Sequence, residues 1–170
     1  VEEISFHLSA TNALFNLAVA MRAWSPDDGN LVVTDLDHMA NVSPWEGVWG
    51  RGRGCEVRRA RVTPEGTLDI DHLLDLVDGR TRIVAVTMAS NGFGTIVPIH
   101  QLVGLIRQRS PALVCVDAVH HALHGPIDVQ GLDVDFLVFS GYKVFGPMLG
   151  VLYGKKALLD KLDPYRVETN

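Results

Sequence analysis

Short, continuous apolar runs alternate along this chain with segments whose apolar residues recur at helical spacing. The apolar runs are residues 31–34, 82–87, 114–116, 136–139 and 150–153, and residues 56–62 form a further strand-like segment of mixed polarity. The helix-like segments cover residues 14–21, 45–53, 69–77 and 99–109, with a further one near the end in KKALLDKL. Uninterrupted apolar strands separated by helices are typical of a mainly parallel sheet covered on both faces. The sequence therefore predicts an α/β fold, a three-layer α/β/α sandwich.

The composition argues against a nucleic-acid-binding protein, a disulfide-rich protein and a membrane-spanning protein. The 170 residues, 47% of them hydrophobic, are enough for one domain with a sizeable core. A net charge of -5 gives no electrostatic case for binding nucleic acid. Two cysteines are too few for a disulfide framework, and no apolar run reaches transmembrane length. These features, with no signal-peptide pattern at the start, favour a soluble cytoplasmic protein without membrane partners.

Polar residues follow three of the apolar runs, which is where ligands bind in parallel sheets. Asp117 follows residues 114–116, Lys143 follows residues 136–139, and Asn91 follows residues 82–87. We expect Lys143, flanked by Val144 and Phe145, to lose hydration, which disfavours its ammonium form and makes the amine nucleophilic. The alternative is an ordinary solvated loop lysine. A lysine and a carboxylate at neighbouring strand ends are what a pyridoxal phosphate site requires.

Residues 116–147, VDAVHHALHGPIDVQGLDVDFLVFSGYKVFGP, carry several motifs in order. This segment resembles the core of class V, fold-type I pyridoxal-phosphate enzymes of the cysteine desulfurase-like group. The resemblance implies that residues 1–170 form most of the large cofactor-binding domain. It also implies that the N-terminal arm and the small C-terminal domain are not in this chain, and that the protein is a homodimer with a site completed by the neighbouring subunit.

The same resemblance implies three catalytic residues that act with pyridoxal 5'-phosphate. Lys143 would form the internal aldimine and move the α-proton, and Asp117 would keep the pyridine nitrogen protonated. His38, in a segment that continues to Asn41 and Pro44-Trp45, resembles the histidine that stacks on the pyridoxal ring. An imidazole suits both stacking and proton transfer. As a lone histidine, His38 is otherwise an ordinary surface or core residue.

Further residues resemble the family's cofactor-binding positions. The full predicted set is Ala10, Thr11, His38, Asn91, Asp117, His120, Ser140, Tyr142 and Lys143. Ala10 and Thr11 would bind the phosphate at the start of a helix, with Ser140 and Tyr142 completing the cradle. Without the resemblance, the Ser9-Ala10-Thr11 stretch is an ordinary helix cap and Asn91 a turn residue.

The sequence departs from the family pattern at two of these positions, Tyr142 and His120, and at two neighbouring ones, Ser9 and Met88. Ser9 stands where a glycine is usual, Met88 and Tyr142 each replace a histidine, and His120 replaces a glutamine near the Schiff base. His120 also lies four residues before His124, a spacing that a helical metal site would use. Gly125-Pro126 ends any helix there and no carboxylate or cysteine completes a ligand set, so we predict no metal.

The predicted activity is cleavage of the C–S bond of cysteine or a cysteine derivative, as a desulfurase or a C–S lyase. Neither Cys55 nor Cys115 matches the nucleophilic cysteine of desulfurases, which lies in the C-terminal domain of the family. A protein sulfur acceptor is therefore an expected partner, besides the small amino-acid substrate. The alternatives are a class V aminotransferase or epimerase, or a non-catalytic partner-binding fragment. No glycine-rich nucleotide-binding motif follows any strand.

Overall fold

The computed structural model describes residues 2–24, 28–50 and 55–163. These residues form a seven-stranded sheet with the order β1-β7-β6-β5-β4-β2-β3. The strands are β1 (Ile4–His7), β2 (Asn30–Thr34), β3 (Glu56–Ala60), β4 (Thr81–Thr87), β5 (Leu113–Asp117), β6 (Phe136–Ser140) and β7 (Gly150–Gly154). Strands β3, β2, β4, β5 and β6 pair in parallel, whereas β7 pairs antiparallel with both β6 and β1. The sheet is therefore mainly parallel, as predicted.

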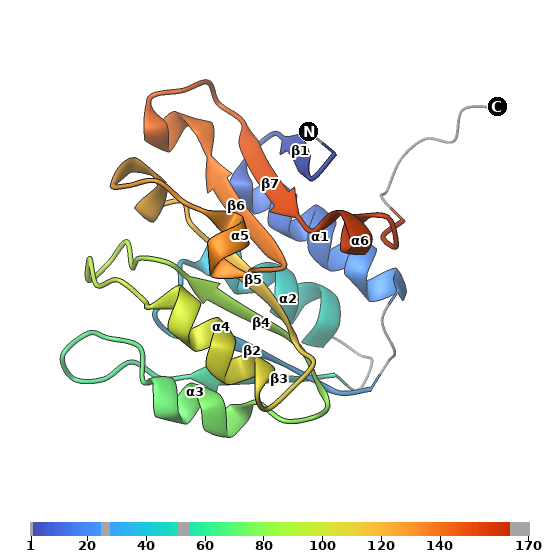
Figure 1. Cartoon of the computed structure of the whole chain (residues 1–170), viewed down its shortest axis with the longest axis vertical. Helices are drawn as coiled ribbons and strands as arrows, with labels where there is room; N and C mark the ends of the chain where they lie inside the picture. The colour runs from blue at the N-terminus through green and yellow to red at the C-terminus, as the bar shows by residue number, and fades with distance from the viewer. Residues whose placement is uncertain (1, 25–27, 51–54, 164–170) are drawn as a thin grey trace.

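Helices cover both faces of this sheet (Figure 1). They are α1 (Ala10–Trp24), α2 (Ser43–Trp45), α3 (Ile70–Leu76), α4 (Ile99–Arg107), α5 (Val129–Leu132) and α6 (Lys156–Leu159). In the view of Figure 1, α3, α4 and α5 lie in front of the strands and α1 and α2 lie behind them. The predicted three-layer α/β/α sandwich is confirmed.

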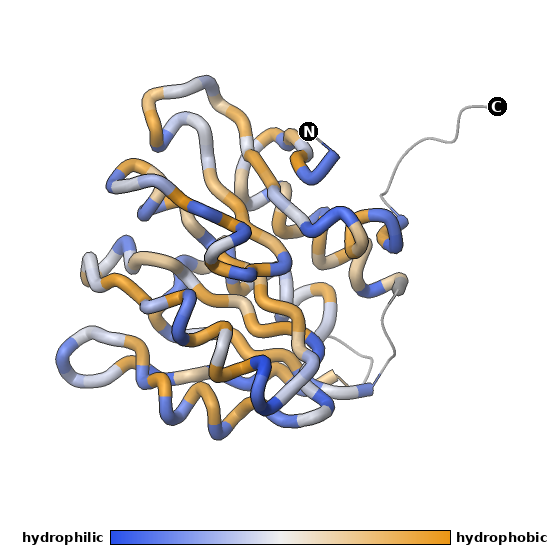
Figure 2. Tube along the Cα trace, viewed as in Figure 1, coloured by the Kyte–Doolittle hydropathy of each residue, from blue (hydrophilic) through white to orange (hydrophobic). Residues whose placement is uncertain are grey.

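The core consists of apolar side chains on the two faces of the strands and on the helices that meet them. On the α4 face, Leu102 and Ile106 pack with Val114, and on the α1 face, Leu14 and Met21 pack with other fully buried side chains. Because a buried parallel strand is covered on both sides, β2 and nearly all of β4 are buried along their length. The hydropathy colouring of Figure 2 shows the apolar residues concentrated in these strands.

Among the described residues, short helical turns position the side chains that follow several of the strands. They are the 3-10 helices η1 (Met39–Asn41), η3 (His121–Leu123) and η4 (Gly141–Val144), and the π-type turn η2 (Glu46–Gly50). Three of them, η1, η3 and η4, follow the carboxyl ends of β2, β5 and β6. The residues beyond these strand ends are therefore held in hydrogen-bonded turns.

Several element predictions need correction. The edge strand β1 (Ile4–His7) was not predicted from the sequence. The helix expected over residues 45–53 begins at Ser43 and continues as the π-type turn to Gly50, and residues 51–53 lie outside the described residues. The strand expected over residues 56–62 ends at Ala60, and Val62 forms a single bridge with Leu68.

Candidate active site

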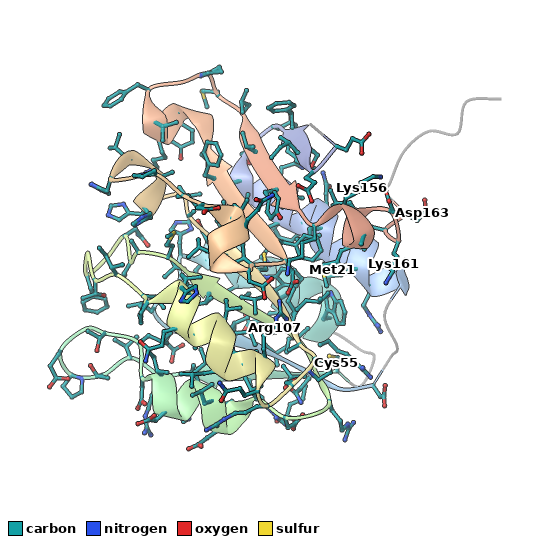
Figure 3. All side chains as sticks on the ribbon, viewed as in Figure 1. Met21, Cys55, Arg107, Lys156, Lys161 and Asp163 are labelled. Atoms are coloured by element: carbon teal, nitrogen blue, oxygen red, sulfur yellow. The ribbon has the colours of Figure 1, made fainter. Side chains whose placement is uncertain are left out.

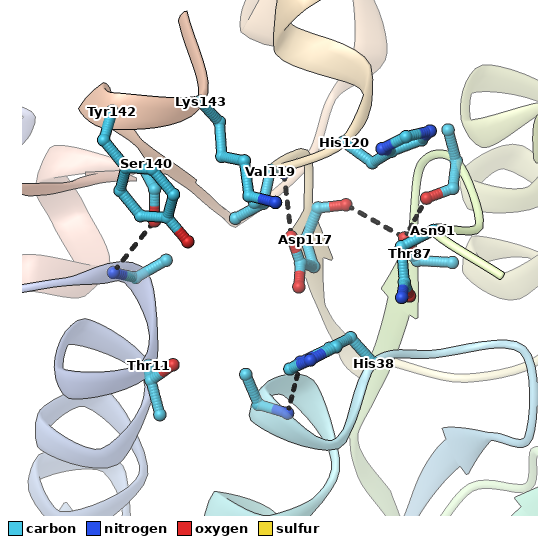
Figure 4. Close-up of a pocket in the computed structure, with 13 residues that line it drawn as sticks. Thr11, His38, Thr87, Asn91, Asp117, Val119, His120, Ser140, Tyr142 and Lys143 are labelled. Carbon is cyan, nitrogen blue, oxygen red and sulfur yellow. Dashed lines mark hydrogen bonds between the residues drawn. The ribbon is translucent and has the colours of Figure 1, made fainter. Parts of the chain in front are cut away.

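A pocket of about 160 Å³ lies at the carboxyl edge of the parallel strands (Figure 4). Its walls come from the start of α1 and from the loops that follow β2, β4, β5 and β6. The lining residues are Ala10, Thr11, His38, Ala40, Thr87, Ala89, Asn91, Asp117, Val119, His120, Ser140, Tyr142 and Lys143. All nine site residues named from the sequence are among them. The structure thus brings the predicted residues together, whereas the role of each stays a prediction.

Asp117 is the last residue of β5 and supplies a buried carboxyl group to the pocket. Its side chain is 5% exposed, and one carboxylate oxygen accepts the backbone N–H of Val119 at 2.8 Å. Burial raises the pKa of Asp117, while the Val119 hydrogen bond and the nearby His38 imidazole lower it. A carboxyl group in this position would gain from a cationic N–H donor placed in the pocket.

The His38 ring lies opposite Asp117 in the close-up (Figure 4). Its Nδ1 accepts the backbone N–H of Ala40 at 3.0 Å, so the side chain caps the η1 turn. A ring nitrogen that accepts a hydrogen bond is unprotonated, which puts the proton of the neutral imidazole on Nε2. The Ala40 hydrogen bond therefore fixes both the orientation and the tautomer of the ring.

Lys143 extends toward the pocket from η4, the turn after β6 (Figure 4). Its Nζ lies 5.6 Å from the centroid of the Tyr142 ring, a cation–π distance. The expected loss of hydration around Lys143 is wrong for this chain. The η4 turn carries Lys143 away from the buried strand, so that its side chain is exposed and the neighbouring Phe145 is 91% exposed.

The start of α1 meets the end of β6 at the other side of the pocket. The backbone N–H of Ala10 donates to Ser140 Oγ at 3.4 Å. Ser9 Oγ accepts the N–H of Asn12 at 3.1 Å, so Ser9 supplies the side-chain cap of α1. Because Ser9 fills that role, Thr11 is not needed as a cap, and its hydroxyl group lines the pocket (Figure 4). A helix start with hydroxyl groups beside it suits an anion.

His120 enters the pocket from the loop after β5, and Asn91 from the loop after β4. The rings of His120 and His124 contact each other edge to face, with centroids 5.5 Å apart. Burial, followed by the charges of His124 and His120, lowers the pKa of the adjacent His121. Among the described residues no three His, Cys, Asp or Glu side chains are grouped closely enough to hold a metal ion.

Asp37 is a partly buried acidic residue beside the pocket that was not predicted from the sequence. Its carboxylate accepts the Thr34 hydroxyl group and, at 2.7 Å, the Asn41 side-chain N–H. Burial raises its pKa to about 7, the Asn41 and Thr34 hydrogen bonds oppose the rise, and the charge of Asp117 adds to it. The signal that could have revealed it is an acid that follows a buried strand and directly precedes His38.

Neither cysteine lines the pocket. Cys115 lies within β5 and is fully buried, with a pKa raised far above that of a free thiol. Cys55 lies just before β3, at the opposite edge of the sheet from the pocket (Figure 3). Burial also raises the pKa of Cys55. Both thiols are therefore poorly placed to act as nucleophiles toward a molecule in the pocket.

The family model of aminotransferase class V matches residues 1–170. The chain belongs to the aminotransferase class V family. It is 39% identical over 166 residues to the cysteine desulfurase of Pectobacterium atrosepticum and 41% identical over 169 residues to that of Dickeya dadantii. In each case 96% of this chain and 40% of the relative are covered.

A solved structure shows the same likeness. The cysteine desulfurase CsdA from Escherichia coli superposes with a TM-score of 0.90 at 31% identity, covering 98% of this chain and 42% of that protein. This class V chain therefore spans well under half the length of the relatives that it matches. None of the helices in its described ranges is both long and apolar enough to cross a membrane.

Proposed function

We propose that this class V chain is the cofactor-binding part of an enzyme that cleaves the C–S bond of cysteine or a cysteine derivative. The observation that carries the proposal is the meeting of Asp117 and Lys143 in one pocket. Asp117 is the last residue of β5, and Lys143 lies in the turn after β6, the parallel strand paired with β5. The relatives named cysteine desulfurase support the choice of substrate. The class V aminotransferases and epimerases share the scaffold, but no residue of this pocket favours either activity.

The residues of the pocket fit pyridoxal 5'-phosphate. The Asp117 carboxyl group is buried and burial raises its pKa, so a protonated ring nitrogen would give it a charged partner. When bound, the cofactor supplies an electron sink for negative charge that develops at the α-carbon of an amino acid. Asp117 would hold the proton of the ring nitrogen, and the flat face of His38 would pack on the ring.

The remaining predicted residues surround these two. Ala10, Thr11, Ser140 and Tyr142 would bind the phosphate at the start of α1. Asn91 and His120 would donate hydrogen bonds on the side of the pocket between β4 and β5. The Lys143 amine would bind the aldehyde and, once displaced by substrate, remove the proton from the α-carbon.

The fate of the sulfur follows from the position of the cysteines. A desulfurase needs a thiol that takes sulfur from the substrate, and neither Cys55 nor Cys115 lines the pocket. The acceptor would therefore be a thiol outside this chain, on further sequence of the same protein or on a partner protein. A C–S lyase would need no such thiol, because the sulfur leaves as a thiol or sulfide.

A homodimer is part of the proposal. The loops around the pocket carry large apolar side chains that are exposed to solvent. These are Leu8, Met39, Phe93, Leu123, Phe145 and Met148. Exposed apolar surface of this extent is typical of an interface rather than of a monomer surface. A second subunit packed there would cover Lys143 and exclude water from the pocket.

The first test is an absorption spectrum of the chain with added pyridoxal phosphate. We expect a visible band with the unchanged chain and with Lys156→Ala, an exposed lysine on α6, and no such band with Lys143→Ala. A Lys143→Ala chain that keeps the band contradicts the assignment of Lys143. With cysteine as substrate, alanine as the product would indicate desulfuration and pyruvate would indicate elimination.

A further inference from the structure

The turn that carries His38 is built around a carboxyl group that does not line the pocket. Residues 34–41 leave the end of β2, pass through His38 and enter the η1 turn. Asp37 lies within this turn, and its carboxylate contacts the first and the last of these residues, Thr34 and Asn41. One carboxyl group therefore joins the two ends of the turn that presents the His38 ring.

The contacts of Asp37 are polar and reach buried partners. Thr34 and Asn41 are fully buried, and the Thr34 Oγ1 that donates to Asp37 also accepts the backbone N–H of Leu36 at 3.2 Å. The backbone N–H of Thr87 also acts on the Asp37 carboxyl group. Buried polar groups are stable only while they keep such partners, so loss of the carboxyl group would leave several donors unpaired.

We propose that Asp37 is a positioning residue that fixes the His38 ring across the pocket from Asp117, by tying both ends of the 34–41 turn to one carboxyl group. His38 follows Asp37 directly, and its own hydrogen bond to Ala40 lies inside the segment that Asp37 closes. The importance of His38 for catalysis rests on the proposed function, but its placement by Asp37 is a property of the ligand-free chain.

The surroundings of Asp37 disfavour a negative charge on its carboxyl group. From β5, Asp117 repels negative charge on Asp37, and from β4 the Thr87 N–H is a neutral donor. Within the turn, Asp35 points to Arg59, with 3.0 Å between Oδ1 and Nη1, and does not hydrogen-bond to Asp37. Hydrogen bonding, rather than negative charge, is then what Asp37 contributes.

This reasoning makes asparagine the substitution that should preserve the clamp. Asn41 Oδ1 is buried and has no hydrogen-bond partner among the described residues. The amide that Asp37→Asn introduces can donate to that oxygen once the Asn41 amide turns over, and it can still accept from Thr34. Asp37→Leu keeps a similar volume but removes every polar contact. Asp35→Asn, which removes a charge two residues away on the exposed side, is the matched control.

The test is NMR of the His38 ring in the full, ligand-free chain, with the His38 signals assigned by their absence in His38→Gln. We expect Asp37→Leu to shift the His38 ring signals and to weaken pyridoxal phosphate binding by about 10-fold or more, as small displacements in a site do. We expect Asp37→Asn and Asp35→Asn to leave both quantities close to those of the unchanged chain.

The outcomes separate cleanly. A folded Asp37→Leu chain with unchanged His38 signals overturns the proposal, as does Asp37→Asn behaving like Asp37→Leu. If Asp37→Leu does not fold, Asn41→Ala removes one of the two ties, and an unmoved His38 ring in that variant overturns the proposal too. Shifted His38 signals in a protein that never binds pyridoxal phosphate would support the placement by Asp37 and contradict the proposed function instead.

Discussion

Gly150, the first residue of β7, lies directly against the backbone of Ser9 at the entrance to α1. A Cβ atom at Gly150 would overlap the Ser9 carbonyl group and approach the Ala10 nitrogen to 2.6 Å. The neighbours are backbone atoms, which cannot rotate away as a flexible side chain would. The absence of a side chain at Gly150 therefore sets how closely the start of α1 approaches the sheet.

We expect Gly150→Ala to destabilise the fold by about 2 kcal/mol or more, because it inserts a methyl group where there is no space. Gly104→Ala in the exposed part of α4 is the matched control, since a Cβ there meets no atom within 4 Å. It should stabilise the chain by about 0.5–1 kcal/mol, the usual helix preference for alanine over glycine. Urea unfolding measures both, and an equal effect of the two substitutions would contradict the packing argument.

Asp135 is expected to be among the most costly carboxylates to remove. It is buried before β6, accepts the N–H of Val114 at 2.7 Å and pairs with Arg107 at 2.6 Å and Lys155 at 3.1 Å. Asp135→Ala should cost about 3 kcal/mol, because it leaves the buried Val114 N–H without an acceptor and removes the buried partner of Arg107 and Lys155. Among the described residues, these two cations then keep only the exposed Asp133 as an acidic partner. Asp160→Ala, which breaks an exposed pair with Lys156, should cost about 0.5 kcal/mol or less. Comparable losses in the two unfolding curves would refute this ranking.

Asp37 should make the stability of the fold depend on pH between about 4 and 7. In the unfolded chain its carboxyl group titrates near the ordinary value of 3.8, whereas burial raises its pKa to about 7 in the folded chain. In this range the unfolded state releases the proton and the folded state keeps it, so rising pH favours unfolding.

The free energy of unfolding contributed by Asp37 should therefore fall by up to about 4 kcal/mol as the pH rises from 4 to 7, at about 1.4 kcal/mol for each pKa unit. Asp37→Asn should remove this slope, and Asp35→Asn should retain it. Urea unfolding at several pH values measures the difference between each variant and the unchanged chain. Parallel pH profiles for the unchanged chain and Asp37→Asn would exclude Asp37 as the source.

Replacing Asp117 by asparagine should raise the stability of the ligand-free fold and weaken the binding of pyridoxal phosphate. Burial raises its pKa, so the ionised carboxylate is disfavoured in the ligand-free fold above the ordinary pKa. Asp117→Asn keeps an oxygen that can accept the Val119 N–H and removes the buried charge. We therefore expect a higher melting temperature at pH 7 without ligand, together with weaker pyridoxal phosphate binding. A variant that loses stability and keeps its affinity would contradict both parts.

The strands could be predicted because each is a local run of apolar residues, and the pocket could be predicted because its motifs follow one another in a fixed order along the chain. The apolar runs that contain Val84, Val114 and Val138 are buried strands, as expected from their composition. The polar residues after these runs converge because parallel strands end at the same edge of the sheet. The pocket residues were chosen because they resemble cofactor-binding positions of the class V family, and sheet direction supported only Asp117, Lys143 and Asn91 independently.

Other features depend on contacts that no local pattern encodes. The strand β1 is four residues long and lies at a sheet edge, where its pairing with β7 decides its conformation. Lys143 is exposed because the η4 turn leads the chain away from the buried strand β6. The sequence after β6 does not reveal whether the chain turns outward or stays buried at this point. The burial of Asp37 reflects the fold of a polar turn back onto β4 and β5, and a carboxylate in a polar stretch normally indicates solvent.

The hydrogen bond from Ala10 to Ser140 joins residues that are 130 positions apart in the chain. Contacts of such long sequence separation form slowly, because a large loop must close before they can stabilise anything. Both residues of this distant pair lie at the pocket, because α1 forms one wall and the turn after β6 forms another. Ligand capture during refolding should accordingly lag behind the formation of helices, and the pocket would serve as a marker of the last step of folding.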